Sequence, residues 1–85
     1  MKPKDLLHRA ARGDVRNIRF ADLEQLVLAL GFEFDHTSGS HHIYVHPFTK
    51  KQLNLQPQGR QAKPYQVRQV LGQVERYSLR LKDES

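Results

Sequence analysis

The 85-residue chain has no cysteine, no long apolar run and almost no acidic residues between positions 47 and 82. The lack of cysteine excludes disulfide bonds, thiol catalysis and cysteine-ligated zinc, and is typical of a reducing compartment. No apolar stretch approaches the roughly 18 residues of a membrane-spanning helix, and residues 1–14 are polar and charged rather than signal-like. We therefore expect a cytoplasmic protein that is neither secreted nor inserted in a membrane.

Length limits the organisation of the chain, because so short a sequence can build only one hydrophobic core. We expect a single domain over residues 1–85. Within it, residues 1–16 form an N-terminal helical extension, residues 17–77 form the core and residues 78–85 form a tail.

The positive charge is concentrated in the second half. Residues 1–46 hold six Lys/Arg and six Asp/Glu, whereas residues 47–82 hold eight Lys/Arg against Glu75 alone, a net charge of +7. Such an asymmetry favours binding to a polyanion, because neutralised phosphates supply most of the non-specific affinity for nucleic acid. A solvated basic face that serves solubility is the alternative interpretation of the charge alone.

Three helices are predicted. A short one follows Pro3, carries Leu6, Leu7, Ala10 and Ala11, and ends before Gly13. The second has apolar residues at helical spacing from Phe20 to Leu30 and stops at Gly31. The last begins at Pro64, with a buried stripe that contains Val67, Val70, Leu71 and Val74 and extends to Tyr77. Leu79 and Leu81 could extend it, whereas residues 82–85 are expected to fray.

Between the last two helices the apolar period changes from about 3.6 to 2, which is typical of strands. We expect one strand with Phe32 and Phe34 on its apolar face, a turn over residues 36–39, a second strand over residues 40–46 ended by Pro47, and a third around Leu53 and Leu55. Short connections favour an antiparallel sheet. The predicted fold is a two-layer α+β sandwich with helices on one face of a three-stranded sheet.

Three of the five histidines, His41, His42 and His46, fall within six residues. In a strand His41 and His42 point to opposite faces, and His42 and His46 lie about 13 Å apart, too far for one metal ion. The sequence contains no other metal-binding or catalytic motif of a common kind: it has no HExxH pattern, no GxSxG elbow and no carboxylate pair. What remains is acid/base chemistry by a histidine among cations: an imidazole can take the proton from an RNA 2′-hydroxyl without a metal.

Residues 39–47, Gly-Ser-His-His-Ile-Tyr-Val-His-Pro, resemble the GSHHxFxHP signature of the HicA family of toxins, small ribonucleases paired with a HicB antitoxin. Further segments that are similar to the family are Asn17-Ile18-Arg19-Phe20, Asp22-Leu23, Gly31-Phe32, Asn54-Leu55-Gln56-Pro57 and residues 63–69. The resemblance covers most of residues 17–77. It implies a fold like that of double-stranded-RNA-binding domains, with an extra N-terminal helix.

The resemblance also implies a function. The histidine after Gly-Ser, His41, would be the catalytic group of an endoribonuclease, an mRNA interferase, that needs no metal or other cofactor and that a HicB-type antitoxin inhibits. It places Tyr44 in the core with His42 and His46 on its face, whereas simple alternation would bury His41 with Ile43 and Val45. We follow the family register and expect His41 to be solvent-accessible, on the sheet face away from the last helix.

The RNA-binding candidates are the basic residues that follow the second strand: Lys50, Lys51, Arg60, Lys63 and Arg68. Together they could form a track for phosphates, because A-form RNA is recognised mostly through its backbone and 2′-hydroxyls. The antitoxin is expected to cover His41 and to contact several of Lys50, Lys51, Arg60 and Lys63, burying about 1,200 Å² or more in total.

A non-catalytic RNA-binding module, or a protein-interaction module, remains the alternative. A single histidine supplies only one catalytic group, whereas phosphodiester cleavage usually needs both an acid and a base. The Gly-Ser-His signature favours the enzyme, since a pure binding module has no need for it.

Overall fold

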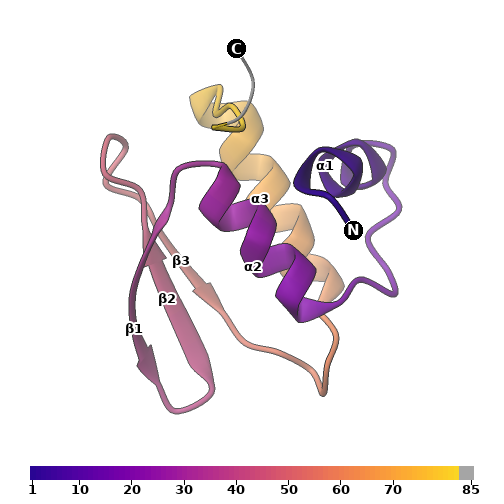
Figure 1. The fold of residues 1–85 in the computed structure, drawn as a ribbon, viewed down its shortest axis with the longest axis horizontal. Helices are drawn as coiled ribbons and strands as arrows, with labels where there is room; N and C mark the ends of the chain where they lie inside the picture. Colours follow the sequence, from indigo (N-terminus) through magenta and orange to yellow (C-terminus); the bar gives the residue numbers. More distant parts are fainter. Residues whose placement is uncertain (83–85) are drawn as a thin grey trace.

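The computed structural model describes residues 1–82. Its elements are α1 (Pro3–Ala11), α2 (Phe20–Ala29), β1 (Glu33–Ser38), β2 (His41–Val45), β3 (Gln52–Leu55) and α3 (Pro64–Tyr77). The strands form one antiparallel sheet in the order β1-β2-β3. Figure 1 shows the helices on one side of the sheet, with α1 farthest from it. The predicted α+β class is confirmed, and the order of the elements is compatible with a double-stranded-RNA-binding-domain-like fold.

The helix ends follow from local chemistry. Pro3 and Pro64 occupy the first turns of α1 and α3. Proline lacks a backbone N–H, but an N–H in the first turn has no acceptor within the helix, so no hydrogen bond is lost. After α2 the chain turns at Gly31, whose φ of 98° disfavours any residue with a Cβ. A Cβ at Gly31 would also stand only 3.1 Å from Nε2 of His46. Glycine therefore satisfies both the backbone and the packing where α2 leads into β1.

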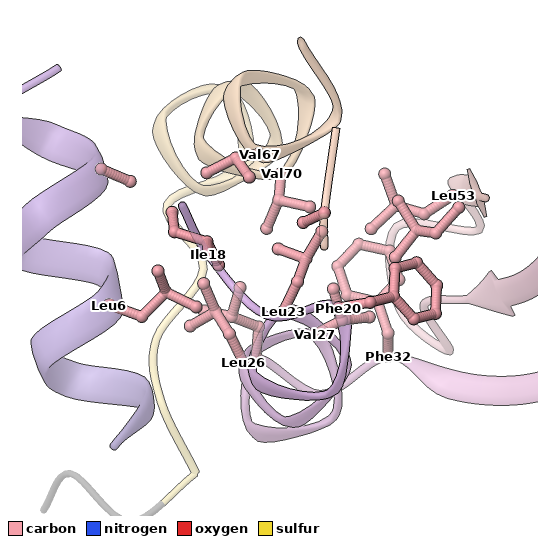
Figure 2. Packing of buried hydrophobic residues seen from close by; sticks show 14 of the residues in the cluster. Leu6, Ile18, Phe20, Leu23, Leu26, Val27, Phe32, Leu53, Val67 and Val70 are labelled. Carbon is pink, nitrogen blue, oxygen red and sulfur yellow. The ribbon is translucent and has the colours of Figure 1, made fainter. Parts of the chain in front are cut away.

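The hydrophobic core lies between the three helices and one face of the sheet. Figure 2 shows Leu6 of α1 and Val67 and Val70 of α3 directed toward α2. The core side chains with no more than 1% of their surface exposed include Leu6, Ile18, Leu23, Leu26, Val27, Phe32, Leu55, Val67 and Val70. Because Leu6 and Ala10 are buried in the same cluster, the predicted N-terminal extension packs as part of the core.

Alternation along the strands separates the two faces of the sheet. Tyr44, Leu53 and Leu55 belong to the core cluster, and Tyr44 is 2% exposed. Because neighbouring residues in a strand point to opposite faces, His41 and Ile43 lie on the other face of β2. Ile43 is buried at 5% exposure but does not belong to the core cluster. The register with Tyr44 in the core, which the family resemblance implied, is the one observed.

The first hairpin differs from the expectation in two ways. A break in register between Phe34 and His36 inserts an extra residue in β1, and β1 then continues through Ser38 to a loop of only two residues. The turn predicted over residues 36–39 is therefore wrong at residues 36–38, which belong to β1, and the observed turn consists of Gly39 and Ser40. Phe34 is not buried with Phe32: it pairs with Tyr44 at the outer strand and is 53% exposed.

The tail also differs. Ser78, with a left-handed φ of 52°, ends α3, so Leu79 and Leu81 do not extend the helix. Leu81 is nonetheless buried, and the backbone N–H of Lys82 donates to the carbonyl of Ala29 at 2.7 Å. Fraying at Lys82 is thus contradicted, while residues 83–85 lie outside the described part of the chain. None of the helices within residues 1–82 is long and apolar enough to cross a membrane.

Candidate active site

A tight turn places His41 at the first position of β2. Ser38 pairs with His41, so Gly39 and Ser40 alone connect the strands. Gly39 has a φ of 59°, the positive value that two-residue hairpin turns require and that glycine adopts at little cost. The two-residue Gly-Ser turn therefore fixes the position of His41 as the first residue of β2. The His41 side chain is partly exposed there.

Asn54 of β3 holds the His41 ring. The two residues are diagonal neighbours on the sheet face away from the core, and Nδ1 of His41 lies 2.7 Å from Oδ1 of Asn54. An amide oxygen can only accept, so Nδ1–H is the donor. With the proton on Nδ1, Nε2 of the neutral ring carries the free lone pair. The imidazole is thus held in the tautomer that a general base needs.

A chain of hydrogen bonds brings a positive charge to the same turn. The Lys63 ammonium donates to Oε1 of Gln56 at 3.1 Å, and Nε2 of Gln56 donates to the Ser40 hydroxyl at 2.9 Å. The backbone N–H of Gln56 donates in turn to Oε1 of Gln66, a buried residue of α3. Lys63 is therefore linked through one amide to the residue that precedes His41.

His41 opens onto a groove of about 560 Å³ between β3 and α3. Its polar side chains, besides His41, are Gln52, Asn54, Tyr65, Gln66, Gln69, Gln73 and Arg76. Tyr65, Gln69, Gly72 and Arg76 are spaced by three or four residues, so they form one stripe along α3. His41 thus lies on the open face of the sheet as expected, but α3 forms the opposite wall of its groove.

The predicted RNA-binding residues are spread over the molecule. Lys63 is linked to the His41 turn, and Arg68 is exposed on α3, one turn from Tyr65 in the groove. Lys50 and Lys51 lie at the other end of the sheet, where the backbone N–H of His46 donates to the carbonyl of Lys51. Five strand residues, about 17 Å, separate that end from His41.

Arg60 lines a second hollow, at the start of α2, together with Arg19, Glu24 and His42. The five basic residues therefore do not form one compact cluster around His41. Of these five, Lys63 is linked to the His41 turn, Lys51 lies with the groove residue Arg76 over the Tyr77 ring, and Arg60 belongs to the other hollow.

His42 faces the helices and has different partners. Its Nδ1 lies 3.1 Å from Oε2 of Glu24, and its ring packs edge-on against Phe20. The same carboxylate oxygen accepts a hydrogen bond from the Tyr44 hydroxyl. Burial, followed by the hydrogen bond and the negative charge of Glu24, raises the pKa of Tyr44 well above its usual value near 10. His42 therefore joins a network between the sheet and α2.

His46 is buried and stabilises the second turn. Its Nδ1 accepts the backbone N–H groups of Phe48 and Thr49 at 3.2 and 3.3 Å, and its ring packs edge-on against Phe32. These contacts give His46 a structural role. Within residues 1–82, no three His, Asp or Glu side chains lie close enough together to hold a metal ion.

Sequence reasoning missed most of the groove. Asn54 was noted only as part of a similar segment, and Gln52, Gln69, Gln73 and Arg76 were not singled out as site residues. For α3 the signal was present, because Tyr65, Gln69 and Arg76 recur at helical spacing on the face beside the buried stripe. For Asn54 the contact depends on the register between β2 and β3, which the sequence alone does not specify.

Fold and site together define a small α+β protein that presents an oriented histidine beside a polar, partly basic groove. The family model described as the HicA toxin of bacterial toxin-antitoxin matches residues 20–75. The chain therefore belongs to the HicA toxin family, and membership implies a toxin with an antitoxin partner. Comparisons with curated proteins and with solved structures gave no match.

Proposed function

We propose that the chain is an endoribonuclease that cleaves messenger RNA without a metal ion, with His41 as its general acid/base. The observation that carries the proposal is the hydrogen bond from Nδ1 of His41 to Asn54 at the mouth of the groove. It leaves Nε2 as a proton acceptor on a partly exposed ring. Membership of a toxin family supports the same interpretation.

In the proposed reaction, Nε2 of His41 takes the proton from a ribose 2′-hydroxyl. The 2′-oxygen attacks the adjacent phosphorus, and the bond from phosphorus to the 5′-oxygen of the next nucleotide breaks. The products are a 2′,3′-cyclic phosphate and a 5′-hydroxyl whose proton comes from water. The hydroxide that remains takes the proton from the His41 imidazolium, which restores the neutral ring. Negative charge grows on the phosphate oxygens during the attack, so a nearby ammonium or guanidinium stabilises the transition state.

Lys63 is the proposed source of that stabilisation, because it is tied to the His41 turn through Gln56. Arg76 lines the groove farther along α3, where it lies with Lys51 over the Tyr77 ring, and is proposed to bind a neighbouring phosphate. Arg68, Arg60, Lys50 and Lys51 are proposed to contact phosphates farther along the strand, which strengthens binding without touching the reacting bond.

The antitoxin partner is proposed to be a HicB-type protein that covers the groove. A partner seated over His41 excludes RNA sterically, and acidic groups on it would match the basic surface of residues 47–82. Addition of this partner is expected to stop cleavage and to shield His41 from solvent. A complex that leaves His41 exposed and the enzyme inhibited would contradict the steric model.

The decisive experiment compares wild type with His41→Ala on RNA in the presence of EDTA. We expect cleavage by wild type and a loss of about 10²- to 10⁴-fold in the variant, the usual contribution of a general acid or base. His8→Ala is the matched control, because His8 is exposed on α1. Circular dichroism confirms that each variant is folded. Cleavage that survives in His41→Ala, or that EDTA abolishes, would show the mechanism to be wrong.

The alternative, a module that binds RNA or protein without cleaving it, is tested by the same samples. Binding of RNA by wild type with no product at any protein concentration would support it. Lys63→Gln and Lys50→Gln separate the two roles further. For an enzyme, the first is expected to slow cleavage more than the second, because only Lys63 is linked to the His41 turn.

A further inference from the structure

The groove beside His41 is lined by amides from two elements. Gln52 and Asn54 come from β3, and Gln66, Gln69 and Gln73 come from α3. Among residues 1–82 no carboxylate lines it, and the charged groups that do are Arg76 and, when protonated, His41. A site built only for phosphates would hold mainly cations. The lining indicates a ligand that offers both hydrogen-bond donors and acceptors.

We propose that this groove holds one unpaired nucleobase next to the scissile phosphate, so that the substrate is single-stranded RNA. The inference rests on the proposed ribonuclease function and names its substrate class. Each Asn or Gln amide has a donor and an acceptor side by side, the arrangement that pairs with a base edge in two parallel hydrogen bonds. The volume of about 560 Å³ is in the range of sites that bind small organic groups.

Gln73 supplies an independent observation. Its Oε1 is fully buried and has no hydrogen-bond partner among residues 1–82. A buried acceptor without a partner is costly, of a size comparable to a lost hydrogen bond, so native proteins rarely keep one without a purpose. Gln73 lines the groove, so a turn of its side chain brings this oxygen to the groove surface, where the N–H groups of a base are suitable donors.

Tyr65 adds a surface for stacking. Its hydroxyl accepts a hydrogen bond from Nε2 of Gln66 at 3.3 Å, yet the residue is 52% exposed at the groove. Aromatic rings that are held in place and open to solvent are the usual partners of unstacked bases in single strands. An exposed ring and an amide array therefore meet in one groove, one for the face of a base and the other for its edge.

A duplex does not fit this arrangement. The bases of A-form RNA are stacked and paired, and the helix presents backbone and 2′-hydroxyl groups to proteins. A paired base could enter a groove between β3 and α3 only after being flipped out, which costs unstacking and unpairing energy. The chain combines the element order of a duplex-binding fold with a lining suited to an unpaired base.

The first test measures binding without cleavage. Full-length His41→Ala is titrated with a fluorescein-labelled single-stranded RNA octamer of mixed sequence and with the same octamer annealed to its complement, both at 150 mM salt. We expect tighter binding of the single strand, and a loss of about tenfold when Tyr65→Ala is added but little loss with Tyr65→Phe, which retains the ring. Equal affinity for both forms, with no effect of Tyr65→Ala, would overturn the proposal.

The second test measures base selection by the active chain. Wild type is incubated with oligonucleotides that differ only in the base beside the cleaved bond, and kcat/KM is compared among the four bases. We expect a preference of about tenfold or more that Gln73→Met abolishes, because methionine has a similar shape but no amide. Gln25→Met is the matched control, since Gln25 is exposed on α2.

The two tests separate the two proposals. If wild type cleaves no RNA but the single strand binds with the expected dependence on Tyr65, the ribonuclease proposal fails and the base site stands. If wild type cleaves all four oligonucleotides equally and Gln73→Met changes nothing, the ribonuclease proposal stands and the base site is refuted.

Discussion

Replacement of Asn54 tests whether the orientation of His41 matters for catalysis. Asn54 is exposed and its side chain contacts the imidazole, so Asn54→Ala removes the hydrogen bond with little effect on the core. A neutral hydrogen bond contributes about 0.5 to 1.5 kcal/mol net. At about 1.36 kcal/mol per factor of ten, the loss of orientation should lower kcat/KM about 2- to 13-fold. This is far less than the loss expected for His41→Ala.

Asn54→Asp separates positioning from charge. Aspartate can still accept the Nδ1–H bond, but its negative charge favours the protonated imidazole. At a partly exposed site the effect is on the order of 1 kcal/mol after screening. The acid limb of the pH–activity profile should therefore move upward by about 0.7 pH unit, with activity near the wild-type level on the alkaline side. Asn54→Ala is expected to lower the profile without that displacement.

The assay is the initial rate of cleavage of one fluorogenic oligonucleotide between pH 5 and 9, under conditions that give kcat/KM. Gln58→Ala is a suitable control, because Gln58 is an exposed amide in the loop before α3. Two results would refute the reasoning. One is unchanged activity in Asn54→Ala; the other is an Asn54→Asp profile that coincides with that of wild type along the pH axis.

Two further predictions concern stability, each measured by urea unfolding. His46→Leu should lower the free energy of unfolding by about 2 kcal/mol, because it leaves two backbone N–H groups without their acceptor, and an unchanged value would contradict the role of Nδ1. The raised pKa of Tyr44 predicts lower stability above pH 10. There the unfolded chain releases a proton that the folded protein retains, so the free energy of unfolding falls by at most about 1.4 kcal/mol per pH unit for this group. Tyr44→Phe should flatten that fall, and an equal slope in both proteins would exclude Tyr44 as its source.

Much of the fold could be predicted because local chemistry and packing agree over long segments. The helix spacing around Leu23 and Val27, and Pro64 at the start of α3, locate α2 and α3 correctly. The first hairpin was harder, since Thr37 and Ser38 are common in turns but are also compatible with a strand. Thr37 and Ser38 belong to the strand because Ser38 pairs with His41, and strand pairing depends on tertiary structure.

Burial was less predictable than secondary structure at the edges of the fold. Phe34 alternates correctly with its neighbours but stands on the outer strand, where no helix covers it, so it remains exposed. Leu81 shows the opposite error. It follows the end of α3 in a charged tail, yet the chain folds back and places it in the core cluster. Neither position in space could be obtained from apolar periodicity, which reports the face of an element and not what covers it.

The residues of the candidate site likewise fall into those that the sequence can predict and those that it cannot. His41 could be predicted because the Gly-Ser-His segment resembles a family signature, and a tight turn requires the glycine. Asn54 and the glutamines of α3 could not be, because polar residues on an exposed face look alike in sequence whether they line a groove or only meet solvent. Their role depends on how α3 lies against the edge of the sheet.

The three clustered histidines show how this chain can assign different tasks to one residue type within six positions. Each ring has its Nδ1 engaged: that of His41 by an amide oxygen, that of His42 by the Glu24 carboxylate and that of His46 by two backbone N–H groups. The oxygens of Asn54 and Glu24 can accept a hydrogen bond from Nδ1–H, whereas backbone donors need an Nδ1 that carries no proton. Only an amide oxygen orients the ring without adding charge and leaves Nε2 as an acceptor. His41 is therefore the histidine whose partner, exposure and groove together suit it to exchange a proton with RNA.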